Sequence, residues 1–71
     1  MAQIEILNQI AVILKTGPPK SAKTIAESSG IHIRSVYRYI NWIDLMSKTF
    51  SHRMERKVVS GTPYYQLIRI I

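Results

Sequence analysis

Four hydrogen-bonding side chains recur at helical spacing in the middle of this 71-residue sequence. Arg34, Tyr37, Arg38 and Asn41 are three or four residues apart, so a helix would present them on one face. An arginine guanidinium can donate two hydrogen bonds to O6 and N7 of guanine, and an asparagine amide can pair with adenine in the same bidentate way. We therefore expect Arg34 and Arg38 to contact base edges of double-stranded DNA, with Asn41, one turn deeper, as a third candidate.

Phosphate contacts are expected from other residues of the same region. Ser35 and Tyr37 carry hydroxyl groups beside the two arginines. Backbone amides at the start of a helix also attract phosphate oxygens, because they lie at the positive end of the helix dipole. This adds Ser21 and Lys23, at the start of a preceding helix, to the candidate DNA-binding residues.

The charge of the chain is strongly positive and unevenly distributed. Ten Lys and Arg against four Asp and Glu give a formal charge of +6. Positions 1–19 carry Glu5 and Lys15, which cancel, so the whole excess lies in positions 20–71. Such a field attracts phosphate polymers and releases their counterions on binding. The alternative is a positive surface that serves only solubility.

Chemistry of other kinds finds no support in the sequence. There is no cysteine, so disulfides, thiolate zinc sites and cysteine nucleophiles are excluded. The serines have no triad context, the acids stand singly, and the three glycines are isolated rather than part of a phosphate loop. His32 and His52 have no partner at metal-ligand spacing. We expect no enzymatic activity, no metal, no cofactor and no small-molecule ligand.

Apolar periodicity predicts three helices. In the first, which ends before Gly17 and Pro18-Pro19, the apolar positions are Ile4, Ile6, Leu7, Ile10, Ala11, Ile13 and Leu14. This arc covers about half the circumference, more than one packing face needs, so strands or a second copy must cover the rest. Ser21 is expected to cap a second helix over 22–28 by accepting from the amide of residue 23 or 24. Gly30 suits the turn to a third helix, from Ile33 to about Met46, whose expected core positions are Val36, Tyr39, Ile40, Ile43 and Met46.

Beyond Lys48 the pattern becomes extended and predicts a β-hairpin. Phe50, His52 and Met54 alternate with polar residues, and 64–71 is rich in aromatic and β-branched residues, with Tyr64 and Tyr65 facing opposite ways. The turn falls at 59–62, with a glycine able to take a positive φ, followed by Pro63 where no ladder amide is needed. Arg56 and Lys57 stand near the hairpin tip, either as DNA contacts or as charges that protect a sheet edge.

Residues 25–40 resemble a known DNA-binding motif. They are similar to the helix-turn-helix of bacterial and phage winged-helix regulators of the deoxyribose-operon-repressor type, which typically have the pattern Leu-Ala-x-x-Leu-Gly-Val-Ser-x-x-Thr-Val-x-Arg-x-Leu. The residues that fit are Ile25, Ala26, Gly30, Ile31, Ser35, Val36, Arg38 and Ile40. Ser29 replaces a leucine that plugs the gap between the helices, and His32 replaces a serine or threonine cap, a role for which histidine is poorer.

The resemblance implies a three-helix winged helix-turn-helix, mainly α with a β-hairpin, as one domain over 1–71. It implies that the third helix enters the major groove and that the hairpin, or wing, reaches phosphates or the minor groove. Trp42 and Tyr39 are expected in the core or at its rim rather than as a stacking platform for single-stranded bases.

The favoured function is that of a small, repressor-like regulator that occupies an operator. The alternatives are a winged helix that docks on polymerase or another protein complex, and an architectural, excisionase-like factor that bends DNA. Because one copy would contact only about half a site, specificity is expected to require a homodimer on a palindrome, binding to a direct repeat, or a partner. The first helix and the apolar C-terminus 67–71 could supply the homodimer interface. The N-terminus lacks a secretory signal, and the apolar run 10–14 is too short to span a bilayer, so we expect a cytoplasmic, nucleoid-associated protein.

Overall fold

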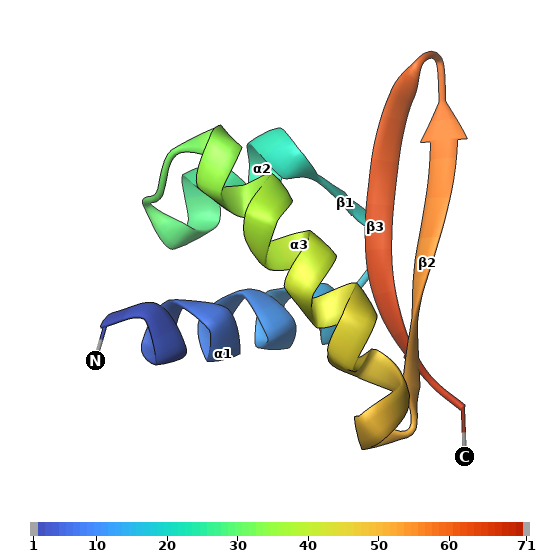
Figure 1. Cartoon of the computed structure of the whole chain (residues 1–71). Coiled ribbons are helices and arrows are strands. Elements are labelled where there is room, and N and C mark those ends of the chain that lie inside the picture. Colours follow the sequence, from blue (N-terminus) through green and yellow to red (C-terminus); the bar gives the residue numbers. More distant parts are fainter. Residues whose placement is uncertain (1, 71) are drawn as a thin grey trace.

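Three helices precede a two-stranded hairpin in the computed structural model, which describes residues 2–70 (Figure 1). The elements are α1 (Ala2–Lys15), β1 (Lys20–Ser21), α2 (Ala22–Ser29), α3 (Ile33–Ser47), the 3₁₀ turn η1 (Lys48–Phe50), β2 (His52–Val59) and β3 (Thr62–Arg69). This confirms the predicted α+β class and the order of its main elements. The arrangement, three helices followed by a hairpin, is consistent with a winged helix.

The strands form a three-stranded antiparallel sheet in the order β1-β3-β2, so β3 is central. β1 was not predicted, because two polar residues carry no alternation of apolar and polar positions. It pairs through Lys20 with Tyr65 and through Ser21 with Tyr64. Further along β3, the Gln66 amide donates a hydrogen bond to the Gly17 carbonyl at 3.1 Å. The loop between α1 and α2 is thereby fixed along β3.

The hairpin closes at Ser60 and Gly61, which have φ of 52° and 79°. Two successive positive φ values are the signature of a type I′ turn, whose twist matches that of the flanking strands. Val59 pairs with Thr62 across the turn, and Pro63 lies opposite Val58 in the next pair. The predicted turn and its glycine conformation are confirmed. The predicted strand end at Ile71 lies outside the described residues.

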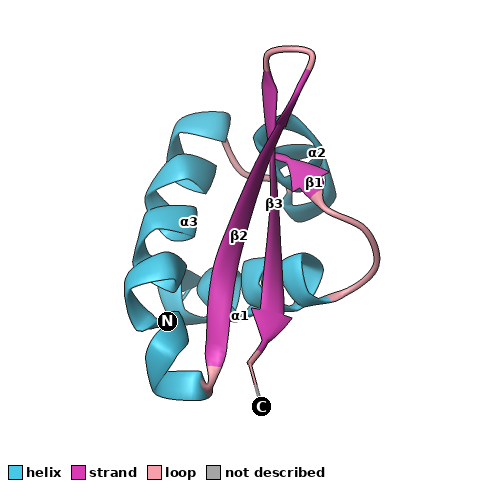
Figure 2. Ribbon diagram, turned by 90° about the vertical axis from the view of Figure 1, so that its right-hand side faces the viewer, coloured by secondary structure: helices cyan, strands magenta, loops and turns pink. Residues whose placement is uncertain are grey.

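The core lies between the helices and one face of the sheet. Figure 2 shows the sheet on one side of the helices. Its buried hydrophobic residues are Ile10, Leu14, Ala22, Ile25, Val36, Tyr39, Ile40, Ile43, Tyr65 and Leu67. Four of the five positions predicted for α3 are therefore buried. Tyr65 faces the core while Tyr64 is half-buried, and Trp42 packs edge-on against Tyr39 at the rim, with ring centroids 5.4 Å apart.

Two predictions at the end of α3 were wrong. Met46, expected in the core, is 37% exposed, and Phe50, expected in a strand, belongs to η1 and is 63% exposed. The helix continues to Ser47, which follows Ile43 by four residues and Ile40 by seven and so takes the central inward position. Ser47 is buried, and its hydroxyl donates to the Asp44 carbonyl at 2.8 Å. Met46 is thereby turned to the flank, and the chain reverses only at Ser51, with φ of 60°.

The buried position of Ile25 gives a test of this core. The side chain of Ile25 is fully buried, so Ile25→Ala should lower the free energy of unfolding by about 2–5 kcal/mol through lost burial and a residual cavity. Urea denaturation followed by circular dichroism measures the change. Leu45→Ala is the control, since Leu45 is 74% exposed, and it should shift stability by no more than about 0.5 kcal/mol. Equal effects of the two substitutions would contradict the core described above.

Candidate nucleic-acid interface

Capping interactions fix both ends of α2, and the one at its C-terminus forms the turn to α3. Ser21 has extended backbone angles, and its hydroxyl accepts from the Thr24 amide at 3.2 Å, which confirms the predicted N-cap. Gly30 takes a left-handed conformation, with φ of 73°, and its amide donates to the Ala26 carbonyl at 2.9 Å. A residue with a Cβ is strained in this conformation, so glycine ends α2 at little cost.

The two departures from the helix-turn-helix pattern are both accommodated. The His32 Nδ1 accepts a hydrogen bond from the Arg34 amide at 3.1 Å, so the histidine caps α3 in place of serine or threonine. The Ser29 hydroxyl donates to the Ile25 carbonyl at 2.7 Å, so the half-buried serine satisfies its polar group within α2. Ile31, between them, packs against the core. The turn therefore keeps its shape with Ser29 and His32 present.

One face of α3 is free of packing contacts with the core. Arg34, Tyr37, Arg38 and Asn41 are all exposed, whereas the opposite face of the helix is buried. Figure 1 shows the N-terminal end of α3 and the tip of the hairpin at the same end of the molecule. The structure thus places the four side chains predicted to share a face together on the exposed side of α3.

A groove of ≈ 360 Å³ lies between α3 and the hairpin. Tyr37, Arg38 and Asn41 line it from α3, and Arg56 lines it from β2. The remaining lining residues are Ile40, Asp44, Met54 and Tyr65, which the sequence did not assign to the site. A polyanion lying in this groove would meet a cationic side chain from each of two separate elements, Arg38 of α3 and Arg56 of β2.

The strand register separates Arg56 from Lys57. Arg56 lies opposite Tyr65, and Lys57 lies opposite Tyr64. Directly opposed residues share one face of a sheet and neighbouring residues point to opposite faces, so Arg56 is on the Tyr65 face, towards α3, and Lys57 is on the other. Alternation along the predicted strand, with Met54 and Arg56 two residues apart, would have revealed this pairing of Arg56 with the groove.

The basic side chains of the groove are not neutralised within the described residues. Across 2–70 the single ion pair is Arg53 with Glu55, at 3.3 Å between their side chains, on the exposed β2 strand. Arg38 and Asp44 line the same groove but do not form an ion pair. Lys20, by contrast, is engaged internally: its amine donates to the carbonyls of Ile13, Thr16 and Pro18 at the end of α1.

The other predicted DNA-binding residues lie outside this groove. Lys23 is exposed on α2, and Ser35 is half-buried on α3. Ser21 is half-buried, and its hydroxyl is engaged with Thr24 through both the capping bond and a side-chain contact of 3.1 Å. Of the nine predicted residues, four line the groove, Arg34 extends its α3 face, and Lys57 is on the far face of the hairpin.

Comparison of the chain with protein-family models, with curated proteins and with solved structures found no significant match. The described part of the chain contains no group of three or more His, Asp or Glu side chains that could hold a metal ion. No helix between residues 2 and 70 has the length and apolar content needed to cross a membrane.

The His32 cap provides a test of how α3 is held. His32→Ala removes the acceptor for the Arg34 amide and should lower the free energy of unfolding by about 1 kcal/mol. His32→Ser, which restores a strong capping residue, should match or exceed the stability of the parent chain. Urea denaturation measures both. If His32→Ala were as stable as the parent chain, the hydrogen bond from the Arg34 amide to His32 would contribute nothing to α3.

Proposed function

We propose that this chain binds double-stranded DNA as a small, repressor-like transcription regulator, with α3 in the major groove and the hairpin beside the adjacent backbone. The observation that carries the proposal is the set of cationic side chains without ion-pair partners in the described residues: Arg34 and Arg38 on α3, and Arg56 across the groove. The likeness of residues 25–40 to the helix-turn-helix of deoxyribose-operon-repressor-type regulators supports the same assignment.

The residues of α3 divide by chemistry. Arg34 and Arg38 are four residues apart on the exposed face and can each donate two hydrogen bonds to a guanine. Asn41 follows one turn later and lines the groove, where its amide has the donor and acceptor needed for adenine. Tyr37, on the side of α3 that faces the hairpin, and Ser35 supply hydroxyls for phosphates.

Phosphate binding is completed by Arg56 and by the amide end of α2. Arg56 faces α3 across a gap of ≈ 360 Å³, so a sugar-phosphate strand between the two elements would contact both. Lys23 lies in the first turn of α2, next to backbone amides that have no partner within the helix. Asp44 is the one acid that lines the groove, and it repels phosphate from the C-terminal half of α3. DNA is therefore directed towards the N-terminal turns.

Fluorescence anisotropy with duplex DNA tests the proposal. The parent chain should bind a random duplex at low salt and weaken as salt rises, because counterions are released from the phosphates. Selection from random sequences should then give a preferred site, against which Arg34→Ala with Arg38→Ala should lose about 2–6 kcal/mol, or about 1–3 for each arginine. No binding by the parent at low salt would favour docking on a protein.

A variant of equal charge controls for the general electrostatic effect. Lys48→Ala with Arg69→Ala removes the same two charges from exposed positions outside the groove. This variant should weaken binding to selected and random duplex alike, without loss of preference between them. If the control reduced preference as much as the α3 variant did, base contact by α3 would be refuted.

Adjacent residues on the hairpin provide a second, sharper test. Arg56→Ala and Lys57→Ala remove one charge each, but only Arg56 is on the face that lines the groove. Arg56→Ala should therefore weaken duplex binding at least about threefold more than Lys57→Ala and reduce the salt slope by about 1, as expected for a lost phosphate contact. Equal losses would show that the hairpin acts only through long-range charge.

A further inference from the structure

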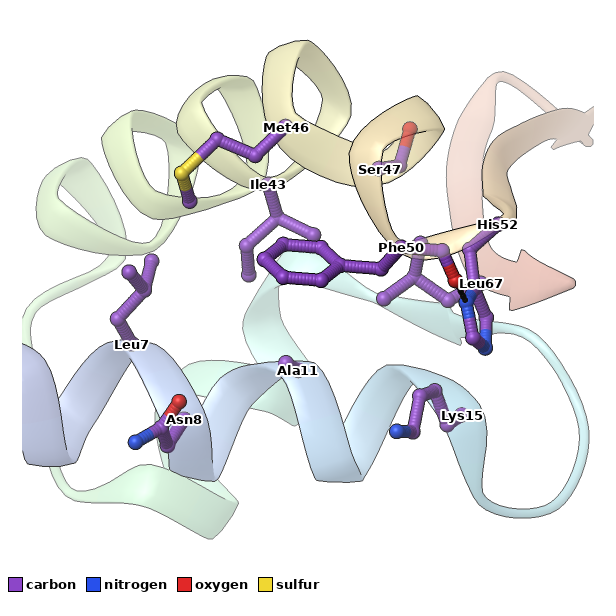
Figure 3. A pocket seen from close by; sticks show the side chains of 10 residues that line it. All are labelled: Leu7, Asn8, Ala11, Lys15, Ile43, Met46, Ser47, Phe50, His52 and Leu67. Carbon is purple, nitrogen blue, oxygen red and sulfur yellow. Dashed lines mark hydrogen bonds between the residues drawn. The ribbon is translucent and has the colours of Figure 1, made fainter. Parts of the chain in front are cut away.

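A second hollow lies at the opposite end of α3, between α1 and the C-terminal turn of α3 (Figure 3). Its volume is ≈ 200 Å³, and its walls are largely apolar: Leu7 and Ala11 from α1, Met46 from α3, Phe50 from η1, and Leu67 at the sheet. Figure 3 shows the Phe50 ring directed into the space between the two helices. None of the groove residues of the candidate DNA interface lines this hollow.

The rim of the hollow is an exposed apolar surface. Phe50 is 63% exposed although it lines the hollow, and Met46 is 37% exposed. Ile4, also 63% exposed, lies one turn before Leu7 and Asn8 on the same side of α1 and extends this surface. The same face therefore combines a largely exposed aromatic ring with a depression, and two-fold association would place it against the identical surface of a second copy.

The charges of α1 are arranged to complement a second α1. Glu5, Asn8, Val12 and Lys15 form one exposed stripe at spacings of three and four residues, with the acid in the first turn and the base in the last. If two copies of the stripe pack antiparallel about residue 10, Glu5 of each lies beside Lys15 of the other. Positions 1–19 carry no net charge, whereas positions 20–71 carry +6 and would repel the same part of a second copy.

We propose that a second copy of this chain occupies this face, with the two α1 helices antiparallel and the Phe50 side chains buried between them. A standard interface covers about 800 Å² per partner, roughly one sixth of the 5051 Å² surface of this chain. The face has the required organisation of an apolar centre, with Ile4, Met46 and Phe50, and a charged rim, with Glu5 and Lys15.

Such a dimer leaves the α3 arginines free. Arg34 and Met46 are twelve residues apart, or about 18 Å along the helix, and Phe50 lies beyond Met46. Leu67 lines the hollow but is 7% exposed and belongs to the core, so β3 itself is not part of the proposed interface. The surface itself is inferred from the hollow and its charges, while its use for two DNA half-sites rests on the proposed function.

Sedimentation of the full chain without DNA tests the inference. Between about 1 μM and 1 mM the parent should pass from the 8.2 kDa monomer towards a species of twice that mass. Phe50→Asp should raise the dimer Kd at least about tenfold, as expected for a buried aromatic anchor. Val58→Asp, on the hairpin and 56% exposed, is the matched control and should leave the Kd unchanged. Circular dichroism verifies that both variants fold.

Charge reversal tests the antiparallel arrangement. Glu5→Lys and Lys15→Glu should each weaken the dimer by about fivefold at low salt, because two symmetry-related pairs become repulsive. The double variant Glu5→Lys with Lys15→Glu exchanges the two charges and should restore the parent Kd to within about twofold. A double variant as weak as the single ones would overturn the arrangement. A monomer at all concentrations, or equal effects of Phe50→Asp and Val58→Asp, would overturn the dimer.

These outcomes are separable from those of the DNA experiments. A monomeric chain that still bound duplex would refute the dimer and leave the proposed function in place. A dimer without affinity for duplex would refute the proposed DNA-binding function and leave the dimer in place.

Discussion

The left-handed conformation of Gly30 sets the direction in which α3 leaves α2. Everything that the exposed side of α3 can contact depends on that direction. The Gly30 amide closes α2 on the Ala26 carbonyl, and His32 opens α3 two residues later. With Ile25 and Val36 fully buried on either side, the turn is held by packing as well as by hydrogen bonds.

The sequence predicted the helices well because their apolar spacing and their caps agree. Ser21, Gly30 and the periodic residues of α3 are independent signals for the same boundaries, and local signals that agree specify a structure strongly. The errors lie where no such agreement exists. A small polar residue, Ser47, takes the inward position that hydrophobicity alone assigned to Met46, and β1 exists only because β3 lies beside it.

The candidate site was predictable in part for the same reason. Helical spacing alone places Arg34 and Arg38 on one face, so their exposure could be foreseen. The groove could not be predicted from the sequence, because its two walls are far apart in the chain and meet only through the packing of β2 and β3 against α3. The distinction between Arg56 and Lys57 depends on the strand register, which the type I′ turn at Ser60 fixes.

The position of β3 in the middle of the sheet also bears on how the chain avoids aggregation. An open strand edge offers unpaired backbone groups to any other strand, and a hairpin packed on helices has two such edges. The edge strand β2 carries Arg56 and Lys57, whose charges oppose pairing with the same edge of another copy. The other edge of β3 is covered for two residues by β1, and Gln66 holds the loop that precedes β1 beside β3 by donating to the Gly17 carbonyl. The loop that joins α1 to α2 thus also blocks the addition of a further strand to this edge of the sheet.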